Sequence, residues 1–211
     1  MNTTVCLGVR LTSDGSWASH IAEITARSSR LLRFSARALA DATPNVRLTA
    51  YKQLVRVILD YASAAWDPHE VTYIDSIESV QRKAARLVTK DFSRDVCMTK
   101  VLDNLGLQTL SERRKEHRLH LFYSLRKGDT VLDTANILLP PDYKGHNDHS
   151  LKVKLIQSSN NYTRFSYFHR TIFEWNKLPH TTVLSTSLDS FKNKLISTRP
   201  EVLCDRHKAR V

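Results

Sequence analysis

Four arginines near the start of the chain recur at helical spacing and could bind a line of phosphate groups. They are Arg27, Arg30, Arg33 and Arg37. On an α-helix, where successive residues are about 100° apart, they fall within an arc of about 120°. Each cation that neutralises a phosphate releases a condensed counterion, so such a stripe favours a nucleic-acid backbone as its partner. A solvated helix face without a ligand is the alternative interpretation.

A second basic group lies further along the chain, again at helical spacing. It comprises Arg82, Lys83 and Arg86. The alternative here is a local ion pair, because Glu78 lies four residues before Arg82 and could support the helix. The formal net charge of +11 suits an anionic partner but also a solvated basic surface. These three residues and the four arginines form the candidate nucleic-acid-binding set.

The sequence lacks the residue clusters that are typical of a catalytic or metal centre. A nucleotidyl transferase holds two metal ions between neighbouring carboxylates, and no Asp-Asp pair occurs. The glycines are isolated, which excludes a glycine-rich phosphate-binding loop. Histidines and cysteines form close pairs, but none has the spacing of a complete zinc site. The pairs are His117 with His120, His146 with His149, and Cys204 with His207. We therefore expect no catalytic residue, metal or cofactor in this chain.

Composition indicates an intracellular globular protein. Charged residues make up 25% and hydrophobic residues 41% of the 211 residues, which is typical of a packed rather than a disordered chain. Three cysteines, odd in number and far apart, indicate no disulfide framework and favour a reducing compartment. No signal-peptide pattern or membrane-spanning stretch is recognisable. We expect a cytoplasmic or nuclear location and no membrane partner.

Apolar periodicity predicts a mainly α fold, a bundle of about five helices. The predicted helices span residues 17–40, 44–62, 72–88, 98–105 and 109–127. Thr43-Pro44 is a typical helix start, and Thr72 with Asp75 and Thr109 with Glu112 match capping boxes. Gly106 and Gly128 are expected to end the last two helices. Isolated aspartates such as Asp60 and Asp67 are expected to have structural roles.

The two ends of the chain differ from this bundle. Val5–Leu11 is a short apolar run that predicts a single strand, closed by a turn at Ser13–Gly15. The sequence offers this strand no partner, so we expect residues 1–16 to be the remainder of a larger sheet whose open edge promotes self-association. Residues 129–150 contain adjacent prolines and a polar run, which indicates a linker. Residues 151–211 are expected to form a small appendage, mixed α/β or irregular.

Three elements are predicted in the appendage. Leu151–Gln157 alternates between apolar and polar residues, as a strand does. An aromatic and basic stretch then leads into a short helix before Pro179. The last predicted helix spans Ser187–Leu195, with Thr186 and Asp189 in the positions of a capping box.

The stretch from Leu54 to Arg86 carries the most specific sequence motifs. It reads LVRVILDYAS, then WDPH at residues 66–69 and IESVQRKAAR at residues 77–86. Shorter motifs in the same register are CLGV at 6–9, RTI at 170–172, WNKLP at 175–179 and SLDSFK at 187–192. In this order they resemble the region downstream of the polymerase core in reverse transcriptases of jockey-like non-LTR (LINE-type) retrotransposons. The resemblance covers nearly the whole chain.

The resemblance implies a fragment of an RNA-directed DNA polymerase that lacks the catalytic palm. Residues 1–16 would be the end of the palm and residues 17–128 a thumb-like bundle. The catalytic aspartates and their magnesium would belong to the missing palm, so we expect no polymerisation by this chain alone. In the intact family this region would help to hold template and primer. We therefore expect weak, sequence-independent binding of RNA or RNA–DNA hybrid. The alternatives are a helical protein-interaction module, an inert retroelement remnant, or an enzyme that works with a separate upstream polypeptide.

Overall fold

The computed structural model describes residues 3–93, 95–130, 132–143, 145 and 148–198. The predicted mainly α fold is confirmed, with a two-stranded antiparallel sheet at its start. The described residues form two compact units, one ending at Arg114 and the other beginning at Lys115. We refer to them as the N-terminal and C-terminal units. The division falls inside a helix, whereas the sequence-based boundary was placed after residue 128.

The chain opens with a β-hairpin rather than with the single strand that was predicted. β1 (Thr3–Cys6) pairs with β2 (Val9–Thr12), and Cys6 lies opposite Val9. Leu7 and Gly8 form the two-residue turn, with φ of 47° and 80°. Positive φ at both positions suits the right-handed twist of the strands that they join. The prediction over Val5–Leu11 is therefore wrong, because the apolar run folds back and pairs with itself.

The helices of the N-terminal unit largely follow the predicted pattern. The described residues form α1 (Ala18–Ala38), α2 (Pro44–Ala50), the π-helical turn η1 (Tyr51–Val55), α3 (Arg56–Asp60), α4 (Ser63–Trp66), α5 (Val71–Thr89), α6 (Met98–Asn104) and the start of α7 (Leu110–Lys127). The long predicted second helix corresponds to α2, η1 and α3 in succession. Ala62, in the left-handed region with φ 50°, separates α3 from α4.

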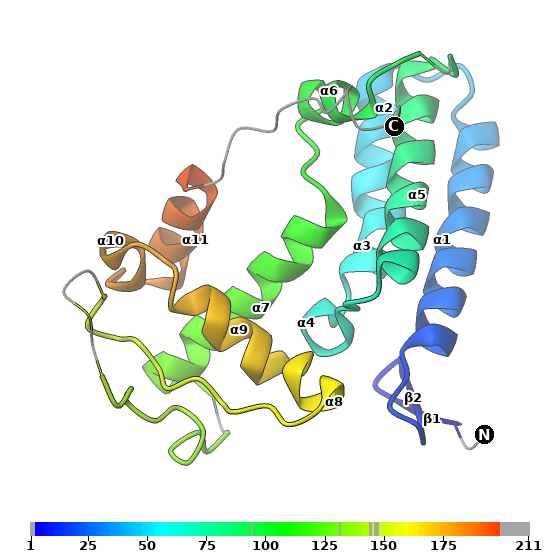
Figure 1. Ribbon diagram of the computed structural model, residues 1–211. Coiled ribbons are helices and arrows are strands. Elements are labelled where there is room, and N and C mark those ends of the chain that lie inside the picture. Colours follow the sequence, from blue (N-terminus) through cyan, green and yellow to red (C-terminus); the bar gives the residue numbers. More distant parts are fainter. Residues whose placement is uncertain (1–2, 94, 131, 144, 146–147, 199–211) are drawn as a thin grey trace, which may run out of the picture. The chain divides into compact units, whose positions relative to one another are not determined.

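Helices α1 and α5 lie side by side and begin at the same end of the unit (Figure 1). The arm formed by α2, η1 and α3 packs against both of them. Each helix contributes a buried apolar face to one core. Its largest contributors are Ile21, Ile24 and Leu32 of α1, Tyr51, Val55 and Leu59 of the arm, Trp66, and Ile77 and Val80 of α5. Burying such a side chain stabilises the fold by about 1.5–3 kcal/mol.

Two predicted capping boxes have different outcomes. The box at the start of α7 is confirmed: the Glu112 N–H donates to Thr109 Oγ1 at 3.2 Å and the Thr109 N–H donates to Glu112 Oε2 at 3.3 Å. The box assigned to Thr72 is wrong, because α5 already begins at Val71 with Glu70 as its N-cap. Thr72 therefore lies inside the first turn, where its hydroxyl cannot take the capping position.

Cysteine chemistry also departs from expectation at one position. Cys6 is a free, exposed thiol. Cys97, which directly precedes α6, is disulfide-bonded. Three widely spaced cysteines imply no disulfide framework, and this single bond at Cys97 was not predicted.

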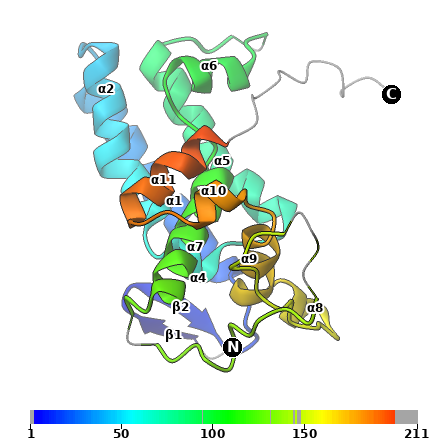
Figure 2. The same ribbon diagram turned by 90° about the vertical axis from the view of Figure 1, so that its left-hand side faces the viewer.

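The C-terminal unit contains the rest of α7 and a set of short helices. They are α8 (Asn161–Arg164), α9 (Tyr167–Trp175), α10 (His180–Val183) and α11 (Leu188–Ser197). Helices α10 and α11 lie next to each other (Figure 2). The core of this unit is aromatic and aliphatic, with Leu119, Phe122, Tyr123, Val153, Ile172, Trp175, Val183, Phe191 and Leu195 buried together. The last helix is capped by Ser187, which accepts from the Ser190 N–H, and not by Thr186 as predicted.

The strand predicted over Leu151–Gln157 is wrong, and a side chain explains why. The Val153 N–H donates to Asn176 Oδ1 at 2.9 Å, and Asn176 Nδ2 donates to the Val153 carbonyl at 2.7 Å. The amide of Asn176 thus makes the two hydrogen bonds that a neighbouring strand would make. Trp175 Nε1 donates to the Leu151 carbonyl at 3.0 Å. The Trp-Asn pair therefore holds an extended segment without a sheet.

His20 connects the hairpin to the helices. Its ring is buried, and its Nδ1 accepts a hydrogen bond from the Arg10 backbone N–H at 3.3 Å. The ring also packs edge-on against Trp66, with 5.3 Å between ring centroids. Burial lowers the pKa of His20, with Arg10 adding to this and Glu23 opposing it. The neutral ring, with its proton on Nε2, is therefore the form that fits this site.

We expect the free energy of unfolding to fall as the pH is lowered through 6.5, the ordinary pKa of histidine. The unfolded chain takes up a proton there, whereas burial resists protonation of His20 in the folded chain. Between about pH 7.5 and about pH 5.5, the free energy of unfolding measured by urea denaturation should fall less for His20→Gln than for the unchanged chain. Some dependence should remain, because burial also lowers the pKa of His149.

His69→Gln is the matched control, because it replaces an exposed histidine. It should keep the dependence of the unchanged chain. If His20→Gln also kept the full dependence, burial of this ring would not contribute to the pH response.

Candidate nucleic-acid interface

The four arginines of α1 lie on the side of the helix opposite its buried face. Arg27, Arg30, Arg33 and Arg37 are all exposed. The buried residues Ile21, Ile24 and Leu32 face the core, and by the helical count they centre about 160° from the arginine arc. Within the described residues, none of the four arginines has a hydrogen-bond or ion-pair partner. Their charges are thus directed into solvent.

The basic group on α5 is more varied in exposure. Lys83 is exposed, whereas Arg82 and Arg86 are half-buried. Arg82 Nη2 donates weakly to the Asp75 carbonyl at 3.4 Å. The ion pair suggested between Glu78 and Arg82 does not form, because Glu78 points inward. Of this group, Lys83 is the residue most available to a ligand.

A groove of about 530 Å³ runs between α1 and α5. Small and hydroxyl-bearing side chains line most of it. The lining residues are Ala18, Ile21, Ala22, Thr25, Ala26 and Ser29 from α1, and Thr72, Tyr73, Ser76, Ser79, Val80 and Lys83 from α5. This lining contains no acidic residue and one cation. The groove therefore lets a ligand approach two helix backbones closely without meeting a negative charge.

Some members of both predicted basic groups continue one end of this groove. Arg30 and Arg33 follow the lining residues Ala26 and Ser29 by four positions, so they are their surface neighbours on α1. Arg86 follows Lys83 by one helical turn on α5. Because α1 and α5 start at the same end (Figure 1), these cations gather beyond the last lining residues of both helices. Arg27, by the helical count, lies on the far side of α1 from the groove.

Other arginines of the N-terminal unit bind acidic side chains and are structural. Arg113 binds the Asp60 carboxylate through two nitrogens, with Nη2 at 2.6 Å from Oδ2 and Nε at 3.0 Å. Arg114 Nε donates to Asp67 Oδ1 at 2.7 Å. Arg10 pairs with Glu23 at 2.7 Å. The structural roles predicted for Asp60 and Asp67 are confirmed by these pairs.

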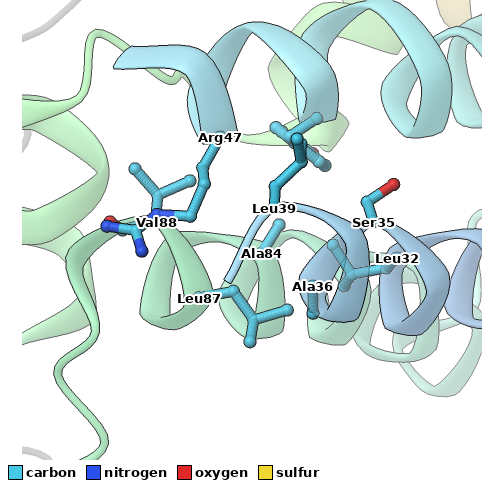
Figure 3. Close-up of a pocket in the computed structure, with 9 residues that line it drawn as sticks. Leu32, Ser35, Ala36, Leu39, Arg47, Ala84, Leu87 and Val88 are labelled. Carbon is cyan, nitrogen blue, oxygen red and sulfur yellow. The ribbon is translucent and has the colours of Figure 1, made fainter. Parts of the chain in front are cut away.

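Arg47 has a different structural role at the end of α5. Its Nη2 donates to the Val88 carbonyl at 2.9 Å, and its side chain lies along a small apolar pocket formed with α1 and α5 (Figure 3). A cation near the last turn of a helix also interacts favourably with the negative end of the helix dipole. Ser35, which lines the same pocket, has a buried hydroxyl without a hydrogen-bond partner among the described residues. Arg47 is therefore committed to the fold and not to a ligand.

A buried polar network, which was not predicted from the sequence, fixes α5. Tyr51 donates its hydroxyl proton to Gln81 Oε1 at 2.8 Å, and Gln81 Nε2 donates to the Gln108 carbonyl at 2.8 Å. Glu78 Oε1 accepts from the Ser111 N–H at 2.8 Å, at the start of α7. Burial raises the pKa of Glu78, although these backbone hydrogen bonds oppose the shift. The signal was present: Gln81 lies four residues after buried Ile77, on the inward face.

Metal ligands do not gather in the part of the chain that the structure describes, where no three His, Cys, Asp or Glu side chains could share an ion. The rings of His117 and His120 are neighbours, with centroids 6.4 Å apart. His146, Cys204 and His207, which completed the other close pairs, lie outside the described residues. Across those same described residues, none of the helices has the length and apolar character needed to cross a bilayer.

No match to this chain was found among protein-family models, curated proteins or solved structures. The similarity to the retrotransposon region rests on the sequence motifs alone.

Replacement of Gln81 should test whether the network holds α5 in place. Gln81→Leu leaves the Tyr51 hydroxyl and the Gln108 carbonyl without this partner inside the protein. Leaving buried polar groups without this hydrogen-bond partner should lower the free energy of unfolding by roughly 2 kcal/mol. Gln157→Leu, the same change at an exposed position, should cost less than about 0.5 kcal/mol in urea denaturation. Equal, small losses in the two variants would contradict a structural role for the network.

Proposed function

We propose that this chain binds RNA or RNA–DNA hybrid weakly and without sequence preference, through the arginine face of α1 and the adjacent groove. The observation that carries the proposal is a contrast among arginines. Arg113 and Arg114 are neutralised by acids inside the fold. The four arginines of α1 are exposed and have no partner among the described residues. Two of them, Arg30 and Arg33, lie next to a groove whose lining has no acidic residue.

Phosphate binding by this surface is an electrostatic process. Each arginine that neutralises a phosphate releases a counterion, which makes the affinity fall as salt is added. The small side chains of the groove, such as Ala22 and Ala26, let a sugar–phosphate strand approach the helices. Long, flexible cations on a helix carry no fixed pattern of base contacts, so binding of this kind positions a duplex without reading its sequence.

The choice of ligand and the origin of the chain rest on the sequence motifs. Their order supports the inference that the chain corresponds to the thumb-like and downstream region of a jockey-like non-LTR retrotransposon reverse transcriptase. In such an enzyme the palm would supply the aspartates and magnesium that form phosphodiester bonds. The residues of this chain would hold the template–primer duplex.

A helical protein-interaction module is the second candidate function. It is favoured by exposed apolar side chains on the arm formed by α2, η1 and α3, among them Leu54, Val57 and Tyr61. The two functions use different helices of the N-terminal unit, because the arm's exposed residues do not belong to α1. An inert remnant of a retroelement is the remaining alternative, in which neither face has a ligand.

Replacing Arg27, Arg30, Arg33 and Arg37 by Gln should flatten the salt dependence of hybrid binding. If all four contact phosphates, the slope of log affinity against log salt should fall by about 3 units. Gln is also a good helix former, and exposed substitutions cost about 0.5 kcal/mol or less, so α1 should remain folded. Fluorescence anisotropy with a labelled hybrid duplex over a series of salt concentrations gives the slope.

A matched control removes the same charge elsewhere. Lys115, Lys127, Arg164 and Lys177 are exposed residues of the C-terminal unit, and replacing them by Gln gives the same net charge. This control should change the slope far less than the α1 variant. Equal slopes for both variants and the unchanged chain would identify the α1 stripe as a solvated face, and the protein-interaction module would then be the better explanation.

A further inference from the structure

Phe34 is an exposed aromatic residue within the arginine stripe of α1. Of its surface, 60% is exposed. By the helical count it falls between Arg27 and Arg30, about 20° from the first and about 40° from the second. Arg30 and Arg37, which lie four residues before it and three residues after it, are its neighbours on the helix surface. An apolar ring therefore projects among cations, on a side of the helix that the core does not use.

The ring of Phe34 has no aromatic or cationic partner among the described residues. Phe173, in the C-terminal unit, shows the contrast. It is also exposed, but the Lys177 ammonium covers its ring, with Nζ 3.8 Å from the ring centroid. Arg30 and Arg37 do not lie over the Phe34 ring in this way. The ring is therefore open to a ligand, with cations on either side of it along the helix.

An open aromatic ring between cations has the chemistry that recognises an unpaired nucleotide. The phosphates of a single strand bind the cations, and a base that is not held in a duplex can stack on the ring. Every base has an aromatic face, so stacking tolerates any sequence. Recognition by Phe34 would therefore agree with binding that has no sequence preference.

A fully paired duplex fits the same surface less well. Its bases stack on one another and present only their edges in the grooves, so the ring has no base face to meet. Phe34 would instead lie against the sugar–phosphate backbone, where an apolar ring displaces water from charged oxygens and gives no hydrogen bond in return. A single strand can turn a base onto the ring and keep its phosphates on the arginines.

We propose that the arginine face of α1 binds single-stranded RNA in preference to a duplex, with one base stacked on Phe34 and the adjoining phosphates on Arg30 and Arg37. This inference rests on the proposed function and narrows its ligand. The arginines supply a salt-dependent attraction for any nucleic acid. Phe34 supplies the preference for an unpaired strand, through a contact that carries no charge.

The test compares single-stranded RNA with a blunt RNA–DNA duplex of the same length, by fluorescence anisotropy with the full-length chain. Phe34→Ala should weaken binding of the single strand by about 5-fold or more, because it removes the stacked ring. It should change duplex binding little, and it should keep the salt slope for both ligands, because no charge is removed. Phe34→Trp should retain the preference for the single strand, whereas Phe34→Leu, which is apolar but not aromatic, should lose it.

Phe92→Ala is the matched control, because Phe92 is exposed to the same extent, 61%, but lies outside α1. It should leave the affinity for both ligands unchanged, and circular dichroism checks that every variant keeps its helices. Unchanged binding of single-stranded RNA by Phe34→Ala would overturn the proposal, as would equal losses for single strand and duplex.

The α1 arginine variant separates this inference from the proposed function. If replacing the arginines weakens binding and Phe34→Ala does not, the arginines bind phosphate but no base stacks on the ring, and only the inference fails. If replacing the arginines changes neither affinity nor salt slope, the proposed function fails as well.

Discussion

The N-terminal unit depends on a few polar groups that α5 buries among its apolar neighbours. Four backbone N–H groups at the start of any helix lack partners within that helix. At the start of α7, Glu78 accepts from one of them, while Gln81 binds the carbonyl of Gln108 just before the helix. Apolar side chains can slide past one another at small cost, but a buried amide or carboxylate that loses its partner is costly. The network therefore sets the rotation of α5 about its own axis.

That rotation decides what α5 presents outside the core. With Gln81 facing inward to Tyr51, Lys83 must line the groove towards α1 and Arg86 must follow it one turn later. The same packing turns Ile21 and Leu32 of α1 inward, and hence the arginines outward. The proposed nucleic-acid surface is in this sense a consequence of the core. The proposed function would use residues that the core leaves outside, namely the α1 arginines, which have no acidic partners among the described residues.

Local signals in the sequence predicted local structure well. The Thr109–Glu112 box and Gly128 marked both ends of α7, because capping hydrogen bonds and positive φ involve only neighbouring residues. Predictions failed where the partner was distant or uncommon. The hairpin was missed because leucine, the residue at turn position 7, rarely adopts positive φ. The extended segment at Val153 is held by Asn176, the residue that follows α9.

The candidate site was predictable in part for the same reasons. Exposure of Arg30 and Arg33 follows from helical periodicity, which the sequence displays. The groove could not be predicted in this way, because Ala, Ser and Thr in its lining have no sequence pattern that indicates a groove. It becomes evident only once α1 and α5 are placed side by side. The ion pairs of Arg113 and Arg114 were likewise not predictable, since their partners Asp60 and Asp67 lie far away in sequence. Charge alone could not distinguish an arginine bound inside the fold from one that faces solvent.

Side-chain NMR offers the most direct test of where nucleic acid binds. Each arginine Nε–H gives a signal that shifts when its guanidinium contacts phosphate, and single Arg→Lys variants assign these signals. On titration with an RNA–DNA hybrid at low salt, the signals of Arg30 and Arg33 should shift together with backbone signals of the groove residues Ala26 and Lys83. The buried Arg114 should remain unchanged and serve as the internal reference. Unchanged signals from α1, with shifts confined to residues of the C-terminal unit, would contradict the account.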